Sequence, residues 1–263
     1  MIRTLSQPRD RSIVFSLSSS LRHLLVAALL IMLVSGELAC ANGADCVRPT
    51  SLPPSEKGQP PNIDGLKSQL TYYECSGAYE REFTRVIDKV ISHVLRRATK
   101  DTKLAIVLDI DETSLSNWAE IKANNFGFIP HGTCNNLPNG PCADDAWERL
   151  ADAKVIEPTL KLFKIAKQKN VGVFFITGRR DADHLLEATK SNLSKAGYAG
   201  WTDLILRSVD DASTVQEFKT AKRKEIEAKG YTIIANVGDQ YSDLKGGYAE
   251  QVYKLPNPFY FIP

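Results

Sequence analysis

The chain has 263 residues, of which 43% are hydrophobic and 24% are charged, and 33 Lys and Arg against 31 Asp and Glu leave a net charge of +2. This mixture is typical of a globular protein with a substantial core, and it excludes collagen, coiled coil and full-chain disorder. The near balance of charge argues against a general binder of nucleic-acid polymers.

The N-terminal segment has the layout of a secretory signal peptide. Residues 1–22 are basic and rich in Ser, residues 24–34 (LLVAALLIMLV) are apolar but too few to span a bilayer, and Ala39-Cys40-Ala41 fits a cleavage site. We expect a signal peptide over residues 1–41, export to a periplasmic or secreted location, and no transmembrane span after its removal. A lipid anchor on Cys40 is the disfavoured alternative, because Glu37 stands where a lipid-attachment site would have Leu.

Export leaves an even set of cysteines in an oxidising compartment: Cys46, Cys75, Cys134 and Cys142. Three pairings are possible. Because Cys134 and Cys142 flank a short loop (CNNLPNGPC), the sequence favours Cys134–Cys142 together with Cys46–Cys75. A four-thiolate zinc site is the alternative, although no C-x₂-C pair supports it.

The elements expected after the signal follow an α/β order. A Pro-rich stretch predicts an extended linker over 42–65, and apolar residues at helical spacing predict one amphipathic helix over 66–98. Continuous apolar runs predict buried strands at 104–110, 171–177, 204–207 and 233–238, with helices near 157–169, 181–196 and 214–229. This alternation predicts a doubly wound parallel sheet with helices on both faces.

About sixty residues separate the first two predicted strands, which is too long for an ordinary connection. The first half of this interval is rich in Asn, Gly, Pro and aromatic residues. We expect a small cap over about 114–155, inserted into a domain that covers 66–263.

Polar residues that can carry chemistry stand where the predicted strands end or where the last helices begin. In chain order they are Asp109, Asp111, Thr177, Gly178, Lys219, Asp239 and Asp243. In a doubly wound sheet ligands bind beyond the carboxyl ends of the strands, so these groups should converge on one pocket. Several carboxylates with a Lys and a Thr suit a divalent cation that faces a multiply charged anion.

The order of these motifs resembles the haloacid dehalogenase superfamily of phosphatases. The stretches FFITGR, FKTAKRKEIEAKGYTII, NVGDQYSDL and VYKLPNPFYFIP narrow the resemblance to the exported acid phosphatase subfamily, which includes class C acid phosphatases and plant vegetative storage proteins. The resemblance spans roughly residues 65–263 and implies a Rossmann-type fold with a small cap and an N-terminal helix.

The resemblance also implies roles for the two acids after the first strand. Asp109 would be the nucleophile and form an aspartyl-phosphate, and Asp111, with its side chain free, would be the general acid and then the general base. The expected metal ligands are the Asp109 and Asp239 carboxylates and the Asp111 backbone carbonyl, with Asp243 as ligand or support. Oxygen ligands favour Mg²⁺.

Thr177, the Gly178 amide and Lys219 would hold the phosphoryl oxygens. These roles predict an exported, Mg²⁺-dependent acid phosphatase that hydrolyses small phosphate monoesters, including 5′-nucleotides, with greatest activity at acid pH. One alternative is a catalytically silent storage or binding relative, against which the presence of Asp109 argues. The other is a phosphotransferase.

The remaining site residues are open between functional and structural roles. Trp118 in the cap either stacks on a leaving group or packs under the cap. Arg179 either reaches the site or pairs with Asp181 or Asp183. Glu112 is expected either to support one of the site residues or to be an acid at the start of a helix.

Overall fold

The computed structural model describes residues 46–49, 58–98 and 103–262. The predicted signal peptide, with Cys40, and half of the predicted linker lie outside these residues. The helices are α2 (Ile63–Cys75), α3 (Ala78–Arg97), α4 (Trp118–Ala123), α5 (Asp144–Leu150), α6 (Glu157–Gln168), α7 (Leu185–Lys195), α8 (Val215–Ala228) and α9 (Tyr241–Leu244). The strands are β1 (Leu104–Leu108), β2 (Leu115–Ser116), β3 (Lys154–Val155), β4 (Gly172–Arg180), β5 (Asp203–Arg207), β6 (Thr232–Gly238) and β7 (Val252–Lys254).

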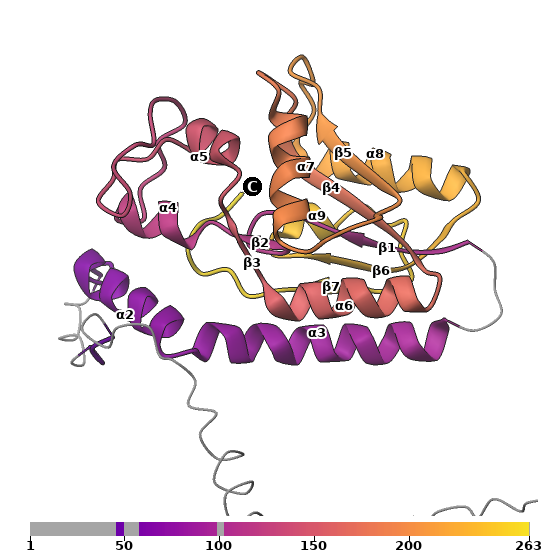
Figure 1. Cartoon of the computed structure of the whole chain (residues 1–263). Helices are drawn as coiled ribbons and strands as arrows, with labels where there is room; N and C mark the ends of the chain where they lie inside the picture. The colour runs from indigo at the N-terminus through magenta and orange to yellow at the C-terminus, as the bar shows by residue number, and fades with distance from the viewer. Residues whose placement is uncertain (1–45, 50–57, 99–102, 263) are drawn as a thin grey trace, which may run out of the picture. The chain divides into compact units, whose positions relative to one another are not determined.

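The central sheet is parallel throughout, with the strand order β5-β4-β1-β6-β7 (Figure 1). β1 lies in the middle, where Ala105 pairs with Gly172 of β4 and with Ile233 of β6. The predicted doubly wound α/β fold is therefore confirmed. β7 was not predicted from the sequence, because its three residues are too few to show a pattern.

Side chains of β1 alternate between the two faces of the sheet, as the period of two requires. Ile106 and Leu108 pack into a core with α3 and α6, which lie side by side in Figure 1. Ala105 and Val107 pack on the other face against Phe218 of α8. Because both faces are covered, the strand is apolar at every position, and this is the signal by which the sequence predicted it.

The prediction of one helix over 66–98 is wrong, because the segment forms two helices, α2 and α3. The break lies at Ser76 and Gly77. Gly77 has φ 71°, a left-handed conformation that ends a helix and that Gly adopts without steric cost. The amphipathic pattern belongs to α3 alone, where Phe83, Ile87 and Val90 are buried, whereas α2 has no buried residue.

The segment between β1 and α6, where the sequence predicts a cap, contains a two-stranded sheet of its own. β2 and β3 pair antiparallel, with Leu115 opposite Val155. Along the chain, α4 and α5 come between these two strands. The disulfide Cys134–Cys142 closes the loop between these helices, and Cys46–Cys75 joins the start of the described chain to the end of α2. Both predicted pairings are confirmed, so these cysteines are not zinc ligands.

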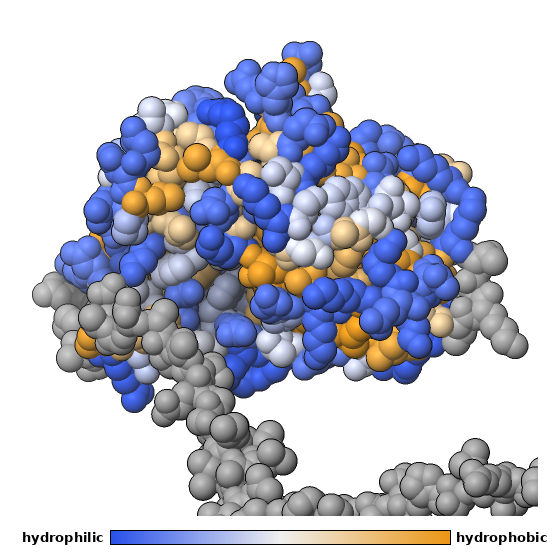
Figure 2. Space-filling model, viewed as in Figure 1, coloured by the Kyte–Doolittle hydropathy of each residue, from blue (hydrophilic) through white to orange (hydrophobic). Residues whose placement is uncertain are grey.

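Figure 2 shows hydrophilic residues over most of the viewed face, with hydrophobic residues in separate patches. None of the helices within the described ranges is long and apolar enough to cross a membrane.

Candidate active site

The carboxyl ends of the strands border a cavity of about 750 Å³. Asp109 follows β1 directly, Gly178 and Arg179 lie near the end of β4, and Asp239 follows β6. The cavity is lined by nearly all of the residues that the sequence singled out, namely Asp109, Asp111, Gly178, Lys219, Asp239 and Asp243, together with Arg179. The topology thus brings together residues up to 134 positions apart, from Asp109 to Asp243.

Asp109, Asp239 and Asp243 form a buried acidic cluster in which one carboxylate oxygen of each lies within 4.8 Å of the others. The backbone amide of Asp109 donates to the Val237 carbonyl at 3.0 Å, which fixes the end of β1 to β6. Asp243 approaches closely because residue 238 is Gly, since a Cβ there would collide with the Asp243 side chain. The close approach of Asp243 to the end of β6 therefore depends on the absence of a side chain at Gly238.

Lys219 of α8 places its ammonium group between two of these acids. Its Nζ lies 2.5 Å from Asp109 Oδ1 and 2.6 Å from Asp243 Oδ1. Thr214 caps the start of α8: its hydroxyl accepts from the Glu217 backbone amide, and the Glu217 side chain accepts from the Thr214 backbone amide. This capping box fixes where the helix begins and so where Lys219 lies. Burial lowers the pKa of Lys219, but the charges of Asp109 and Asp243 outweigh it and raise the pKa overall.

The charges of this cluster suit a divalent cation. Three carboxylates and one ammonium group leave two negative charges in a buried volume when all are ionised. Burial raises the pKa of Asp109 well above its usual value, against the opposing charge of Lys219, and burial and the charge of Asp243 raise the pKa of Asp239 to about 7. A hard divalent cation would favour the ionised forms, so the residues fit such a cation.

Asp239 is oriented by side chains from three parts of the chain. Thr113 Oγ1 donates to Asp239 Oδ1 at 3.1 Å, and Gln240 Nε2 and Asn257 Nδ2 each donate to Oδ2 at 2.7 Å. These donors fix which carboxylate edge faces the cluster.

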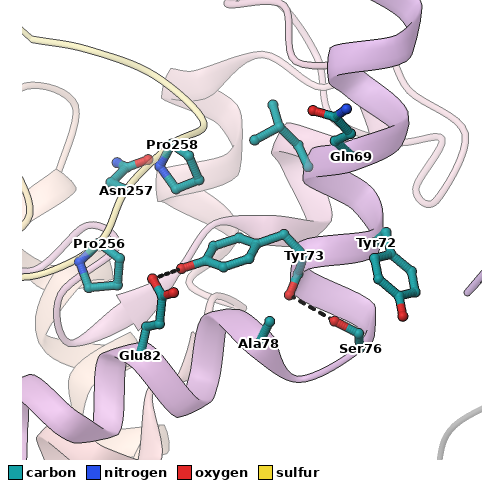
Figure 3. A pocket seen from close by; sticks show the side chains of 10 residues that line it. Gln69, Tyr72, Tyr73, Ser76, Ala78, Glu82, Pro256, Asn257 and Pro258 are labelled. Atoms are coloured by element: carbon teal, nitrogen blue, oxygen red, sulfur yellow. Dashed lines mark hydrogen bonds between the residues drawn. The ribbon is translucent and has the colours of Figure 1, made fainter. Parts of the chain in front are cut away.

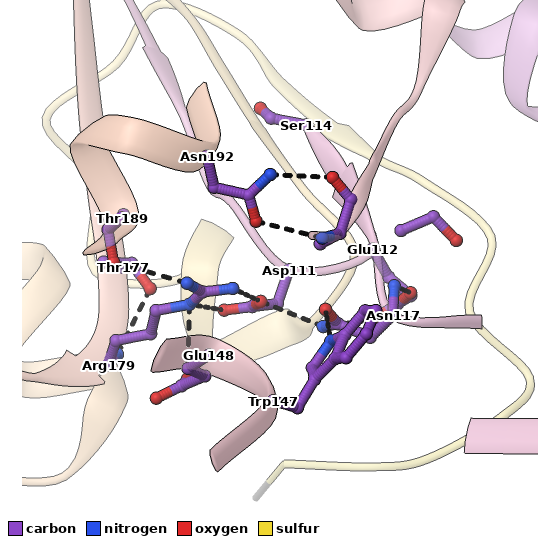
Figure 4. Close-up of polar contacts among 12 residues, drawn as sticks. Asp111, Glu112, Ser114, Asn117, Trp147, Glu148, Thr177, Arg179, Thr189 and Asn192 are labelled. Carbon is purple, nitrogen blue, oxygen red and sulfur yellow. Dashed lines mark hydrogen bonds and ion pairs between the residues drawn. The ribbon is translucent and has the colours of Figure 1, made fainter. Parts of the chain in front are cut away.

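The carboxylate of Asp111 is not free, in contrast to the expectation from the sequence. Arg179 donates from Nη2 to Oδ1 at 2.6 Å and from Nε to Oδ2 at 3.0 Å, and Asn117 Nδ2 donates to Oδ1 at 2.9 Å (Figure 4). Burial opposes ionisation of Asp111, but the charge and hydrogen bonds of Arg179 outweigh it and lower the pKa. Asp111 therefore belongs to a second polar network, beside the acidic cluster.

The two β4 residues expected to hold phosphate lie in different surroundings. Gly178 lines the cavity. Thr177 is fully buried, and its hydroxyl accepts from the Arg179 backbone amide at 3.1 Å, so the hydroxyl is held within the last part of β4, where the register to β5 shifts.

Trp118 packs against Phe126 and Phe259, with ring centroids 5.9 and 5.3 Å away, and does not line the cavity that the described residues form. Its contact with a leaving group stays a prediction. Phe126, Phe128 and Phe261 do line the cavity, and Phe128 and Phe261 are each 72% exposed at its rim.

Several partners in the site were not expected from the sequence, namely Asn117, Trp147, Glu148, Asn257 and Tyr260. Arg179 pairs with Asp111 and with Glu148 of α5, rather than with Asp181 or Asp183. Glu112 is buried and accepts from the Asn117 backbone amide at 2.6 Å and from the Tyr260 hydroxyl at 3.1 Å. Burial raises its pKa to about 8, against these hydrogen bonds. No local pattern in the sequence marks these residues, because each acts through a contact that only the folded chain makes.

A second cavity, of about 590 Å³, lies between α2, the start of α3 and residues 256–258 (Figure 3). The Tyr73 hydroxyl donates to Glu82 at 2.5 Å across it. Among the described residues that line it, Glu82 is the one acidic residue, whereas the acidic cluster lines the first cavity.

The chain is similar in sequence to two plant proteins. The stem 28 kDa glycoprotein of Glycine max is 34% identical over 167 residues, which span 62% of this chain but only 61% of that protein. Acid phosphatase 1 of Solanum lycopersicum is 29% identical over 229 residues, which span 86% of this chain and 84% of that protein.

Among solved structures, the fold is similar to that of the class C acid phosphatase from Bacillus anthracis. The TM-score is 0.57 at 23% identity, over 74% of this chain and 86% of that chain. Residues 61–263 also match a sequence family described as HAD superfamily, subfamily IIIB (Acid phosphatase). Because this match covers most of the sequence, the chain belongs to subfamily IIIB of the HAD superfamily, the acid phosphatases.

Proposed function

We propose that this protein is an exported, Mg²⁺-dependent acid phosphatase that hydrolyses small phosphate monoesters, including 5′-nucleotides, through an aspartyl-phosphate. The observation that carries the proposal is the position of Asp109, which lines the cavity 2.5 Å from the Lys219 ammonium group and within the acidic cluster. A nucleophilic carboxylate, a cation-binding cluster and a fixed positive charge at one point are what phosphoryl transfer requires.

In this mechanism Asp109 attacks phosphorus, and the bond from phosphorus to the leaving oxygen breaks. Asp111 gives its proton to the leaving oxygen and afterwards takes a proton from the water that attacks the aspartyl-phosphate. Arg179 and Asn117 hold the Asp111 carboxylate in place throughout. Because Arg179 lowers the pKa of Asp111, the protonated acid is populated at low pH, which supports the acid preference.

Lys219, the Gly178 amide and Thr177 are proposed to bind the phosphoryl oxygens. On substrate binding, Lys219 would exchange part of its contact with Asp109 and Asp243 for these oxygens and offset the charge that develops on them. Asp109, Asp239 and the nearby Asp243, with the Asp111 backbone carbonyl, are the groups that would hold Mg²⁺. A bound Mg²⁺ would supply charge neutralisation and orient the phosphate.

Export is supported by two observations. Residues 1–41 have the order of a signal peptide, and the four cysteines after them pair as two disulfides, as expected of an oxidising compartment.

The test is phosphate release from an aryl phosphate at acid and neutral pH, with and without Mg²⁺. We expect release that is favoured at acid pH, requires Mg²⁺ and is abolished in Asp109→Asn. The matched control is Asp88→Asn, an exposed residue of α3 that pairs with Lys161, and it should keep full activity. Full activity of Asp109→Asn would contradict the covalent mechanism.

Two further results would favour the alternatives. A folded, metal-loaded protein that releases no phosphate would indicate a storage or binding protein. A shift of product from free phosphate to glycerol phosphate on addition of glycerol would indicate a phosphotransferase.

A further inference from the structure

Two consecutive residues of the cap helix α5, Trp147 and Glu148, contact the two groups that hold Asp111 (Figure 4). Trp147 binds Asn117, and Glu148 binds Arg179. Trp147 is 3% exposed, and the side chains of Arg179 and Glu148 are 1% and 14% exposed, so these contacts are shielded from water.

The contact between Trp147 and Asn117 fixes the orientation of the Asn117 side-chain amide. Trp147 Nε1 is only a donor, and it lies 2.8 Å from Asn117 Oδ1. The amide oxygen must therefore face Trp147, which leaves the amide nitrogen to donate to Asp111 Oδ1 at 2.9 Å and to Glu112 Oε2 at 3.0 Å. Loss of the Trp147 donor would leave the buried Asn117 Oδ1 without this partner and would loosen the position of the side chain.

The second contact fixes the Arg179 guanidinium. Glu148 Oε1 lies 3.2 Å from Arg179 Nε, and Thr189 Oγ1 accepts from Nη1 at 3.3 Å. With the guanidinium held in this position, Arg179 Nε and Nη2 make a bidentate contact with the two carboxylate oxygens of Asp111. Both oxygens of Asp111 are thus engaged by groups that α5 holds.

We propose that Trp147 and Glu148 are positioning residues for the acid-base step, so that the cap helix α5 sets the orientation of Asp111. This inference rests on the proposed phosphatase function and extends it to a new role for the cap. Proton transfer in such a step depends on placement within hydrogen-bonding reach, and a displacement of about 1 Å costs on the order of 10²-fold in rate.

The experiment compares two substrates that differ in their need for a proton. Nitrophenyl phosphate has a leaving group that departs as an anion, whereas an alkyl phosphate needs the proton of Asp111 on its leaving oxygen as the phosphorus–oxygen bond breaks. The quantity kcat/KM reports the transfer of phosphate to Asp109, and it excludes the later hydrolysis that both substrates share. The ratio of the two kcat/KM values therefore measures how well the acid is placed.

We expect Glu148→Ala and Trp147→Phe each to lower kcat/KM for the alkyl phosphate about 10-fold. The kcat/KM for nitrophenyl phosphate should fall less than about 3-fold. The 10-fold loss would be a part of the roughly 10²–10⁴-fold that acid catalysis contributes to the rate. Glu148→Gln should restore most of the loss, because its amide oxygen can take the place of the carboxylate oxygen beside the Arg179 guanidinium. Asp111→Asn is the benchmark for full loss of the acid. Asp152→Asn, an exposed cap residue that pairs with Lys154, is the matched control and should leave the ratio unchanged.

Equal losses on both substrates in Glu148→Ala and Trp147→Phe, with the folded state verified by thermal melting, would overturn the inference. The inference would also be overturned if the ratio of the two kcat/KM values in Glu148→Ala and Trp147→Phe equals the wild-type ratio while Asp111→Asn changes it. If the wild-type protein with Mg²⁺ hydrolyses neither substrate, the proposed function itself fails, and the inference fails with it.

Discussion

The Lys219 ammonium group lies 2.5 Å from a carboxylate oxygen of Asp109, the residue proposed to attack phosphorus. Both side chains are more than nine-tenths buried. A buried ion pair of this kind is costly to break from one side, because the remaining charge loses its partner while still shielded from water. Removal of Lys219 would therefore leave an uncompensated buried charge, and the ammonium group stands where the phosphate would arrive.

Lys219→Met should destabilise the metal-free protein at neutral pH by about 3–5 kcal/mol, the usual cost of removing one partner of a buried pair. Mg²⁺ should raise the melting temperature of this variant more than that of the wild type, because the cation would replace the missing charge. Thermal melting with and without Mg²⁺ measures both effects. Lys222→Met, on the same helix and paired with Glu225 near the surface, should change neither. A variant as stable as the wild type without metal would contradict this account.

Asn257→Ala should weaken metal binding by about 10-fold, within the range of roughly 10–100-fold that loss of a group supporting a metal ligand produces. The reason is that Asn257 Nδ2 donates to Asp239 Oδ2 at 2.7 Å and helps to hold this carboxylate toward the cluster. Calorimetric titration with Mg²⁺ gives the affinity directly. The control is Asn135→Ala in the exposed loop of the cap, and equal affinities in the two variants would argue against the role of Asn257.

Arg179→Gln should lower kcat/KM and move its pH profile toward higher pH. Arg179 lowers the pKa of Asp111, so its removal should raise that pKa and keep the acid protonated to a higher pH. The pH dependence of kcat/KM for an alkyl phosphate measures the shift. Arg97→Gln removes an arginine that pairs with Glu250 and should leave the profile in place. A profile that falls in height without moving would mean that Arg179 does not control this ionisation.

Glu148 should make the stability of the protein fall as pH rises. Burial raises its pKa to about 8 from 4.5, against the opposing charge of Arg179, so between these values the folded state binds more protons than the unfolded state. The stabilisation is complete below about pH 4.5 and is lost as pH rises through 8, by at most about 1.4 kcal/mol per pH unit. Denaturant melts at pH 5 and pH 8 should show this fall, and Glu148→Gln should reduce it. An unchanged pH dependence in the variant would remove Glu148 from the explanation.

The sequence predicted the central strands because burial on both faces leaves a continuous apolar run, as in Leu104–Leu108. It predicted a convergence of acids because parallel strands end at one edge, and Asp109 and Asp239 do follow adjacent strands. The single helix over 66–98 was wrong, since apolar spacing does not reveal the left-handed turn at Gly77.

What the sequence determined by itself was local: hydrophobic periodicity for the strands, the carboxylates at their ends and the cysteines on either side of a short loop. Only the tertiary structure decided which partner each acid has. Asp111 and Arg179 are 68 residues apart, and Glu148 reaches Arg179 from the cap. Such pairings depend on distance in space, and a long polar side chain has the same local sequence pattern whether it meets solvent or a buried partner.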